Sequence, residues 1–268
     1  MKRPFISILT DFGVQTQGIG NMHGVAFSIN PEAKVIDLMH GIADFDIVTG
    51  ARTLETVYFL PVGCHVAVVD PGVGTPRRGI MIQTSRGDYL IGPDNGILLP
   101  AARVLGGCKK VVQISNQKLM HQPVSPIFHG RDVFMPAAAH LSKGTPMEEF
   151  GPELSFHDLA KAPYEEAECR NGKILAEVIH VNKFGSLHFN IRHEVWDQMG
   201  LQKHQQVLMG SDGGSIKFPF VETFGEVPKG KPLIMKDDYL RIEAAINMGN
   251  FSTNYGVGQG AKVTFTGV

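Results

Sequence analysis

The order of apolar segments along the chain limits its fold more than any other feature. Up to about residue 155, apolar runs of strand length alternate with segments whose apolar residues recur at helical spacing. Strands are expected at 5–9, 35–38, 64–69, 80–83, 89–91 and 111–114, and helices at 22–29, 47–58, 97–105 and 132–141. This alternation predicts an N-terminal α/β sandwich domain, with a mostly parallel sheet covered by helices on both faces.

The pattern changes after a polar stretch at 156–172, which contains Pro163 and a short acidic run. We interpret this stretch as a linker, although a solvated helix face fits it equally well. From Gly172 onward, strands are expected at 174–178, 187–191, 206–209, 215–218, 240–246 and 263–265. Short strands joined by glycine-rich turns predict a smaller C-terminal all-β, barrel-like domain. The expected domains are therefore 1–158 and 172–268.

Composition excludes several classes of function. The 25 Lys and Arg residues nearly balance the 26 Asp and Glu residues, and no basic block occurs, which argues against nucleic-acid partners and polybasic membrane binding. No apolar run approaches the ~18–20 residues that a membrane helix needs, and the apolar stretch before Thr10 is too short for a secretory signal. Three scattered cysteines favour a reducing compartment. We expect a cytoplasmic protein.

Two aspartates follow expected strands. Asp11 comes after the first strand and Asp70 after the strand at 64–69, and each has a glycine within two residues. In open α/β sheets, ligands bind outside the carboxyl ends of the strands, where a carboxylate can accept hydrogen bonds from a diol such as a ribose. An aspartate that caps its own turn is the alternative for either residue.

Two further segments could carry chemistry. Residues 70–78 are dense in proline and glycine and form a stiff loop that presents Asp70 and an arginine. Residues 128–132 place His129 beside a glycine just before a helix. Histidine is the commonest proton-transfer group, although a surface or capping histidine is the alternative here. Zinc, phosphate-loop and nucleophile-elbow motifs are absent, so we expect no metal site.

Four runs of residues in the N-terminal half resemble, in collinear order, the S-adenosylmethionine hydroxide adenosyltransferase family, whose relatives include the fluorinase and the chlorinase. The resemblance covers roughly residues 5–155. The runs are Leu9-Thr10-Asp11-Phe12-Gly13, Val69-Asp70-Pro71-Gly72-Val73-Gly74-Thr75, Gly92-Pro93-Asp94-Asn95-Gly96 and Phe128-His129-Gly130-Arg131-Asp132.

The resemblance implies a reaction and an assembly. Members cleave S-adenosyl-L-methionine with water into adenosine and L-methionine, as homotrimers with active sites at subunit interfaces. The resemblance assigns the water-handling set to Asp70, Arg77 and His129 and the ribose contact to Asp11. The halogenases replace this set, so its retention points to water as the nucleophile. No cofactor is implied, because the sulfonium substrate already carries a good leaving group.

The C-terminal half departs from the family pattern. A family Asp-x-Phe-Gly-Asn run appears here as Asn182-Lys183-Phe184-Gly185-Ser186, so a carboxylate and an amide of the substrate site are changed. Loss of that carboxylate should weaken the contact to the ammonium group of the substrate. An aromatic residue expected near Gly18 is also absent. Asn182, Phe184, Ser186, Asp238 and Asn247 are the candidate substrate-binding residues, with Asp238 suggested as the replacement negative charge.

The sequence therefore predicts a hydrolase of S-adenosyl-L-methionine that binds a nucleoside substrate. The same chemistry on another adenosyl-sulfonium compound is an alternative, and so is a non-catalytic adenosine or S-adenosylmethionine binding protein. A halogenase is a weaker third alternative. Glycine makes up 31 of the 268 residues, above the usual ~7%. Because many of these glycines lie in the matched runs, we interpret the excess as backbone shaped around a nucleoside.

Overall fold

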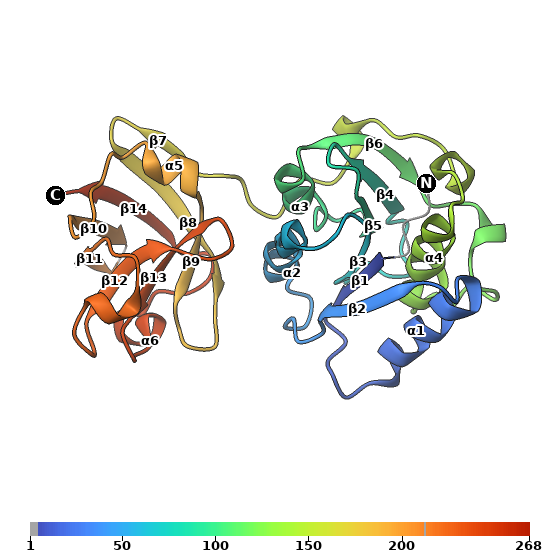
Figure 1. The fold of residues 1–268 in the computed structure, drawn as a ribbon, viewed down its shortest axis with the longest axis horizontal. Helices are drawn as coiled ribbons and strands as arrows, with labels where there is room; N and C mark the ends of the chain where they lie inside the picture. The colour runs from blue at the N-terminus through green and yellow to red at the C-terminus, as the bar shows by residue number, and fades with distance from the viewer. Residues whose placement is uncertain (1–4, 212) are drawn as a thin grey trace. The chain divides into compact units, whose positions relative to one another are not determined.

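The computed structural model describes residues 5–211 and 213–268. The chain divides into two compact units, the first ending at Pro163 and the second beginning at Tyr164. Figure 1 colours the first unit from blue to yellow-green and the second from yellow to red. Each unit has its own hydrophobic core.

The first unit has a six-stranded sheet in the order β2-β1-β3-β5-β4-β6. Its elements are β1 (Phe5–Thr10), α1 (Gln17–Ile29), β2 (Lys34–Met39), α2 (Ile47–Leu54), η1 (Glu55–Phe59), β3 (Cys64–Val68), β4 (Gly79–Thr84), β5 (Tyr89–Pro93), α3 (Leu99–Val104), β6 (Cys108–Gln113), η2 (Gln117–Leu119), η3 (Gly130–Phe134), α4 (Met135–Lys143), η4 (Met147–Phe150) and η5 (Phe156–Asp158). Strand β4 pairs antiparallel with both β5 and β6, while β1, β2, β3 and β5 pair in parallel. The predicted mostly parallel sheet is confirmed.

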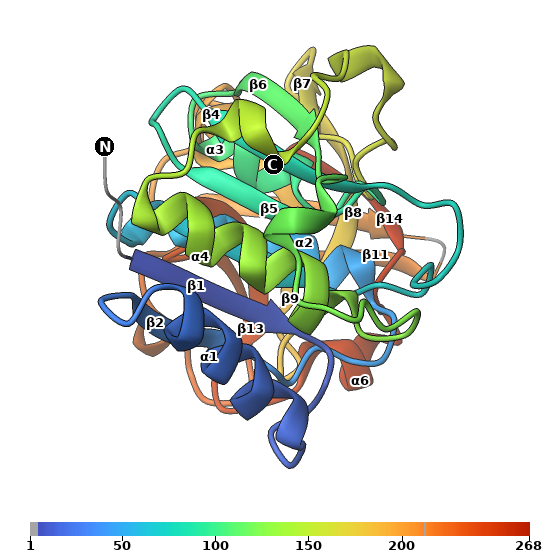
Figure 2. The same cartoon turned by 90° about the vertical axis from the view of Figure 1, so that its right-hand side faces the viewer.

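Helices cover both faces of this sheet. Helices α1 and α4 pack side by side on one face, whereas α2 and α3 lie on the other (Figures 1 and 2). Strand β3 is buried along its whole length, which explains its uninterrupted apolar sequence. Between β3 and α4 the core contains side chains such as Val66, Val68 and Ala138. The unit is an α/β sandwich with the strand ends free to carry loops.

The second unit is a nearly closed, mainly antiparallel sheet of eight strands. Its elements are β7 (Glu168–Arg170), β8 (Lys173–Val181), β9 (Leu187–Arg192), α5 (His193–Asp197), β10 (Gln206–Ser211), β11 (Gly214–Pro219), η6 (Phe224–Glu226), β12 (Pro232–Lys236), β13 (Arg241–Ile246), α6 (Phe251–Tyr255) and β14 (Lys262–Gly267). The order β11-β10-β14-β8-β9-β13-β12 ends in two edge strands, which a bridge between Phe220 and Ile234 brings together. The predicted barrel-like domain is confirmed.

Two parts of the second unit differ from the sequence expectation. The segment interpreted as a linker contains strand β7, and the side chains of Tyr164 and Ala167 are buried. Strand β12 was not predicted from the sequence. It is short, it begins at Pro232, and it lies at the edge of the sheet, where a proline is tolerated because one side of the strand donates no ladder hydrogen bonds.

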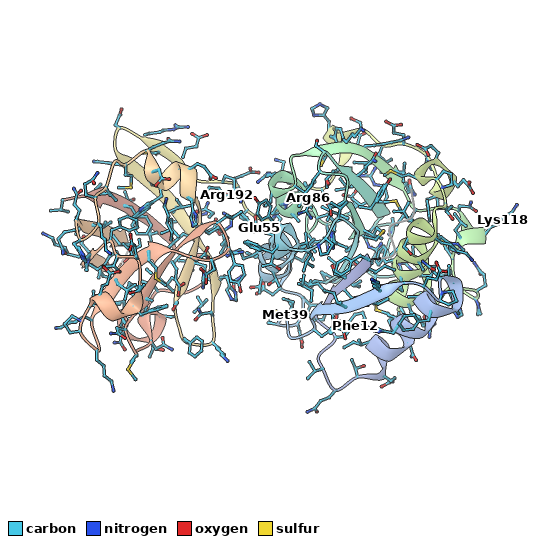
Figure 3. The ribbon with its side chains drawn as sticks, viewed as in Figure 1. Phe12, Met39, Glu55, Arg86, Lys118 and Arg192 are labelled. Carbon is cyan, nitrogen blue, oxygen red and sulfur yellow. The ribbon has the colours of Figure 1, made fainter. Side chains whose placement is uncertain are left out.

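A buried cluster of charged side chains lies near the amino ends of β3 and β5. This edge of the first sheet is opposite the edge where the carboxyl ends of β1 and β3 lie. The Asp88 side chain is fully buried and accepts hydrogen bonds from Arg86 Nε at 2.7 Å and from the Gly63 amide at 3.2 Å. His65 Nε2 lies 3.1 Å from Asp88 Oδ1, and His65 Nδ1 lies 2.7 Å from Ser7 Oγ. Arg86, labelled in Figure 3, also donates to the carbonyls of Val57 and Tyr58. Despite desolvation, these partners hold the pKa of Asp88 well below its ordinary value.

We predict that Asp88→Asn lowers the free energy of unfolding of the first unit by about 3 kcal/mol, because it leaves Arg86 facing a group without charge. Urea denaturation at pH 7, followed by circular dichroism, measures this change. Glu148→Gln is the matched control, since Glu148 forms an exposed ion pair with Lys110 and its loss should be immeasurable. Equal midpoints for the two variants would contradict the prediction.

Candidate active site

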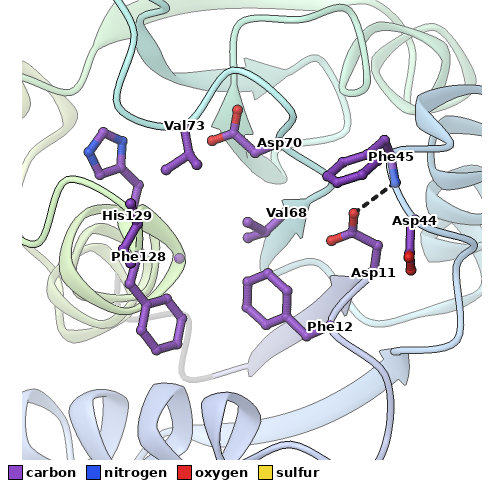
Figure 4. Close-up of a pocket in the computed structure, with 11 residues that line it drawn as sticks. Asp11, Phe12, Asp44, Phe45, Val68, Asp70, Val73, Phe128 and His129 are labelled. Carbon is purple, nitrogen blue, oxygen red and sulfur yellow. Dashed lines mark hydrogen bonds between the residues drawn. The ribbon is translucent and has the colours of Figure 1, made fainter.

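The carboxyl ends of β1 and β3 meet at one edge of the first sheet. The two strands pair in parallel, with Thr10 opposite Val68, so Asp11 and Asp70 follow neighbouring strand ends. Strand β2 lies outside β1 and β5 lies beyond β3, so the strand order reverses at this point, where open α/β sheets bind ligands. A cavity of about 280 Å³ opens there, and Asp11, Asp70 and His129 all line it (Figure 4).

Asp70, Arg77 and His129 form one hydrogen-bonded set. Arg77 donates from Nε to Asp70 Oδ1 at 3.0 Å and from Nη2 to Asp70 Oδ2, which gives a bidentate ion pair. The same Nη2 lies 3.0 Å from His129 Nδ1. Phe134 supports the guanidinium, whose central carbon lies 5.4 Å from the centre of the ring. Arg77 is therefore held from three sides and fixes the carboxylate and the imidazole relative to each other.

The hydrogen bonds determine the proton positions in this set. A guanidinium only donates, so His129 Nδ1 accepts and a neutral His129 carries its proton on Nε2. Burial and the Arg77 charge lower the pKa of His129 below its ordinary value, which favours this neutral form. Burial raises the pKa of Asp70, and this effect outweighs the opposing influence of Arg77. The cavity thus presents a neutral donor beside a carboxylate of increased basicity.

A π-helical turn places His129. Helix α4 begins at Met135, and the preceding η3 turn spans Gly130–Phe134 with His129 at its amino end. Pro136 has no amide hydrogen and cannot donate back to residue 132, so a regular α-helix is interrupted at this point. The expected helix at 132–141 is therefore confirmed in its main part, and its first turn is widened. Such turns recur at functional sites.

Aromatic rings form the apolar side of the cavity. Phe12 and Phe128 pack edge to face, with ring centres 5.7 Å apart, and both line the cavity (Figure 4). A Cβ atom added to Gly18 would lie 3.3 Å from the Phe128 ring. Phe128 therefore occupies the space beside Gly18, where the expected aromatic is absent. The cavity therefore offers apolar surface to a flat ring and carboxylates to polar groups.

Asp11 lies on a different side of the cavity from His129, beside Asp44 and Phe45 (Figure 4). Its Oδ2 accepts a hydrogen bond of 3.1 Å from the Phe45 amide, which leaves Oδ1 for a ligand. Phe45 has a positive φ of 64°, a conformation that bulky residues adopt rarely and that is common at functional sites. Sequence reasoning missed Asp44 and Phe45, because they lie in an irregular loop without a motif.

The glycine interpretation holds only in part. Gly130 lines the cavity, whereas Gly96 is not among the described lining residues, and a Cβ atom there would clash with the Lys161 carbonyl. At Gly74, which has a φ of 76°, a Cβ atom would lie 2.7 Å from the Pro126 carbonyl. This close crossing brings the loop of Asp70 against the loop that leads to His129. Several glycines in the matched runs therefore serve chain packing.

The predicted residues of the second unit separate into two groups. Asn182, Phe184 and Ser186 line a cavity of about 550 Å³ in that unit. Asp238 is exposed, and Asn247 donates from Nδ2 to the Val227 carbonyl at 2.8 Å. Neither of them is among the described residues that line this cavity. Sequence reasoning missed Glu243, a carboxylate that does line it.

Within 5–211 and 213–268, no group of three or more His, Cys, Asp or Glu side chains is arranged to hold a metal ion. No helix in the described part of the chain is long and apolar enough to cross a membrane.

Comparison with known proteins identifies the family. The sequence model of the SAM hydroxide adenosyltransferase N-terminal domain matches residues 6–151, and that of the C-terminal domain matches residues 176–264. The resemblance found in the N-terminal half is thereby confirmed, and it extends to the C-terminal half.

Relatives and solved structures cover almost the whole chain. A protein of Salinispora tropica named (R)-S-adenosyl-L-methionine hydrolase is 34% identical, over 98% of each chain. A protein of the same name from Thermus thermophilus is 32% identical, over 96% of this chain and 98% of the relative. A fluorinase of Actinoplanes is 25% identical, over 98% and 97%. The crystal structure of an uncharacterized conserved protein from Thermotoga maritima superposes with a TM-score of 0.90 and 30% identity, covering 97% of this chain and 99% of that one.

We predict that Arg77→Gln raises the pKa of His129, because the substitution removes the adjacent positive charge that disfavours the imidazolium. NMR titration of the histidine rings in the full-length protein measures this shift. Arg78→Gln is the matched control, since Arg78 pairs with Asp94. An unchanged His129 titration in Arg77→Gln, or an equal shift in Arg78→Gln, would contradict the assignment.

Proposed function

Because the chain belongs to the SAM hydroxide adenosyltransferase family, we propose that it hydrolyses S-adenosyl-L-methionine to adenosine and L-methionine. The names of its relatives point to the (R) configuration at the sulfonium sulfur as the first form to test. The observation that carries the proposal is the Asp70–Arg77–His129 set, of which Asp70 and His129 line a cavity that also contains aromatic rings.

The chemistry requires little beyond an oriented water molecule. The oxygen of water forms a bond to the C5′ carbon of the ribose while the bond from C5′ to sulfur breaks. The electron pair of that bond stays on sulfur, so methionine leaves as a neutral thioether without protonation. One proton of the water must be removed. The site therefore needs a proton acceptor and a hydrogen-bond donor that orients the water oxygen. It must also hold the water in line with the bond from C5′ to sulfur.

The three residues divide these tasks. Asp70 accepts the proton from water, a role supported by the raised pKa of its carboxyl. His129 donates from Nε2 to the water oxygen, since Arg77 occupies its Nδ1 atom. Arg77 stays charged and positions both partners. Neutral His129 cannot be the first acceptor of the water proton, because its Nε2 atom already carries a proton and its Nδ1 atom is occupied by Arg77.

The other residues that line the cavity would bind the nucleoside part of the substrate. Asp11 receives the ribose hydroxyls through the oxygen that Phe45 leaves available. The Phe12 and Phe128 rings offer apolar surface to the adenine. This part of the proposal rests on the parallel pairing of β1 with β3, which brings Asp11 and Asp70 to the same edge of the sheet.

We also propose that the protein works in the cytoplasm as a homotrimer with its sites at subunit interfaces, as the family resemblance implies. Val14, Phe45 and Ile127 are 78%, 65% and 79% exposed, and the last two line the cavity. Apolar side chains of this size at the rim of a site are typical of a surface that another subunit covers. Three free cysteines suit a reducing compartment.

The reaction can be tested directly. Incubation of the purified protein with the (R) and (S) epimers in ¹⁸O-labelled water should release adenosine that carries the label in its 5′-hydroxyl group. Label in any other position would contradict attack at C5′. Tight binding of adenosine without turnover of either epimer would favour the non-catalytic binding protein.

We predict that His129→Ala lowers turnover by about 10²-fold, because the attacking water loses the donor that orients it. Asp70→Asn, which removes the proton acceptor, should lower turnover at least as much. His129→Gln should recover part of the loss, because its side-chain amide can still donate to water but cannot accept a proton. Steady-state kinetics measure both effects. If His129→Gln were as impaired as His129→Ala, the donor role would be wrong.

The assembly gives a separate prediction. Light scattering coupled to size exclusion should give about three times the 29.2 kDa chain mass. Ile127→Glu should shift the mass toward the monomer, because it buries a charge at the interface. Lys118→Glu, on an exposed turn of the same unit, serves as the control. A wild-type monomer with full activity would contradict the interface sites.

A further inference from the structure

The second unit contains a cavity with one buried carboxylate. The cavity lies between the turn that joins β8 to β9, strand β13 and the segment before α6, and its volume is about 550 Å³. Glu243 of β13 contributes the carboxylate, and its side chain is only 7% exposed. Asn182 and Ser186 line the same space. A buried carboxylate beside open volume requires a physical explanation, because burial of an uncompensated charge is costly.

No Lys or Arg side chain is among the described residues that line this cavity. Burial raises the pKa of the Glu243 carboxyl, and this effect outweighs the opposing influence of His188 and of the hydrogen bond from the Ser186 hydroxyl. His188, which pairs with Glu243 across β9 and β13, is engaged elsewhere. Its Nδ1 lies 3.0 Å from Asp237 Oδ2, and its Nε2 lies 3.2 Å from Asn182 Nδ2. Both ring nitrogens of His188 are therefore occupied by partners other than Glu243.

The other polar groups near the cavity cannot supply the missing charge. Asn182 Oδ1 already accepts hydrogen bonds from the amides of Phe184 and Ser186, at 3.0 and 3.1 Å. Asn182 therefore stabilises its own turn. Asp238 is exposed and lies outside the lining, and Asp237 accepts from His188 and from the amides of the following turn. Glu243 is the one carboxylate that lines this cavity among the described residues.

The rim of the cavity is apolar. Phe184 and Met248 both line it, and their side chains are 65% and 76% exposed. A ligand that suits this surface has a cationic end for the carboxylate and a methylene or thioether segment for the rim. The amino-acid part of an adenosyl sulfonium has both features.

We propose that Glu243 binds the α-ammonium group of the amino-acid part of the substrate, and that Phe184 and Met248 contact its methylene chain. The proposal rests on the proposed function and names the group that selects an amino-acid substrate. Glu243 would then take the place of the carboxylate that the family pattern has where this chain has Asn182. It would also take the role that the sequence suggested for Asp238. The ammonium supplies the charge that the cavity lacks.

Two sulfonium substrates separate this contact from the reaction itself. The full-length protein is assayed with S-adenosyl-L-methionine and with 5′-dimethylsulfonio-5′-deoxyadenosine, in which a methyl group replaces the amino-acid chain. Glu243→Gln should raise KM for S-adenosyl-L-methionine by roughly 10- to 100-fold, the loss of one charge-assisted hydrogen bond, with little change in kcat. The same variant should leave kcat/KM for the dimethylsulfonium compound unchanged.

Control variants make the test specific. Asp238→Asn removes a nearby carboxylate outside the cavity and should behave as the wild type with both compounds. Glu243→Asp keeps the charge and should recover part of the affinity, which a purely structural role of Glu243 would not require. Circular dichroism verifies that each variant is folded.

A binding measurement distinguishes failure of the inference from failure of the proposed function. Calorimetry with L-methionine, in the presence of adenosine, should show binding to the wild type and at least tenfold weaker binding to Glu243→Gln. If the wild type cleaves S-adenosyl-L-methionine and Glu243→Gln retains both KM and methionine affinity, the inference is wrong and the function stands. If no sulfonium is cleaved, the function is wrong, and the methionine titrations alone decide the role of Glu243.

Discussion

The parallel pairing of β1 with β3 is the constraint on which the first unit depends. It sets Thr10 opposite Val68, so the chain leaves both strands at the same edge and carries Asp11 and Asp70 into one cavity. Parallel strands need crossover segments, and these crossovers bury the two strands beneath helices on both faces. The cost of that burial is offset by apolar packing, whereas the loops beyond the strand ends remain free to hold polar groups. The site therefore lies in loops, where side chains do not have to be apolar to fill the core.

Ion pairs between an arginine and a carboxylate occur in both units. Arg86 compensates Asp88 at one edge of the first sheet, and Arg77 compensates Asp70 at the other. In the second unit, the fully buried Arg241 binds Glu166 through both terminal nitrogens, at 2.9 and 3.0 Å. The outcomes differ, because the pKa of Asp88 is lowered whereas the pKa of Asp70 is raised. Asp88 collects further donors from its surroundings, while Asp70 relies mainly on Arg77 and faces a cavity that water and substrate can enter.

Much of the fold was predictable because its signals are local. The fully buried strand β3 has an unbroken apolar run, and α2 shows helical spacing, so both were identified from the sequence. Strand β12 was missed because it has five residues and begins with a proline. The reversed direction of β4 was also not predictable, since the apolar pattern of a buried strand is the same in either direction. Direction depends on connections and on contacts between distant segments.

The site was predictable where its residues lie in short motifs, and not where tertiary structure brings them in. Asp70 and Arg77 are seven residues apart in one loop, and the family resemblance indicated them together with His129. Phe45 reaches the cavity through an irregular loop before α2, and nothing local to its sequence indicates this. Glu243 lies between apolar neighbours in a strand, a position that a simple alternation assigns to solvent. An irregular register between Arg241 and Glu243 accompanies the burial of both side chains.

A resident arginine distinguishes Asp70 in the first unit from Glu243 in the second. Asp70 is already paired with Arg77, so a cationic ligand gains little there, and its remaining capacity is to accept a proton from water. Glu243 has the Ser186 hydroxyl beside it and no Lys or Arg among the described residues that line its cavity, so an ammonium ligand can pair with it. One carboxylate is thereby suited to proton transfer and the other to recognition of an ammonium group. The difference follows from the neighbours that the fold supplies, since the two side chains are chemically alike.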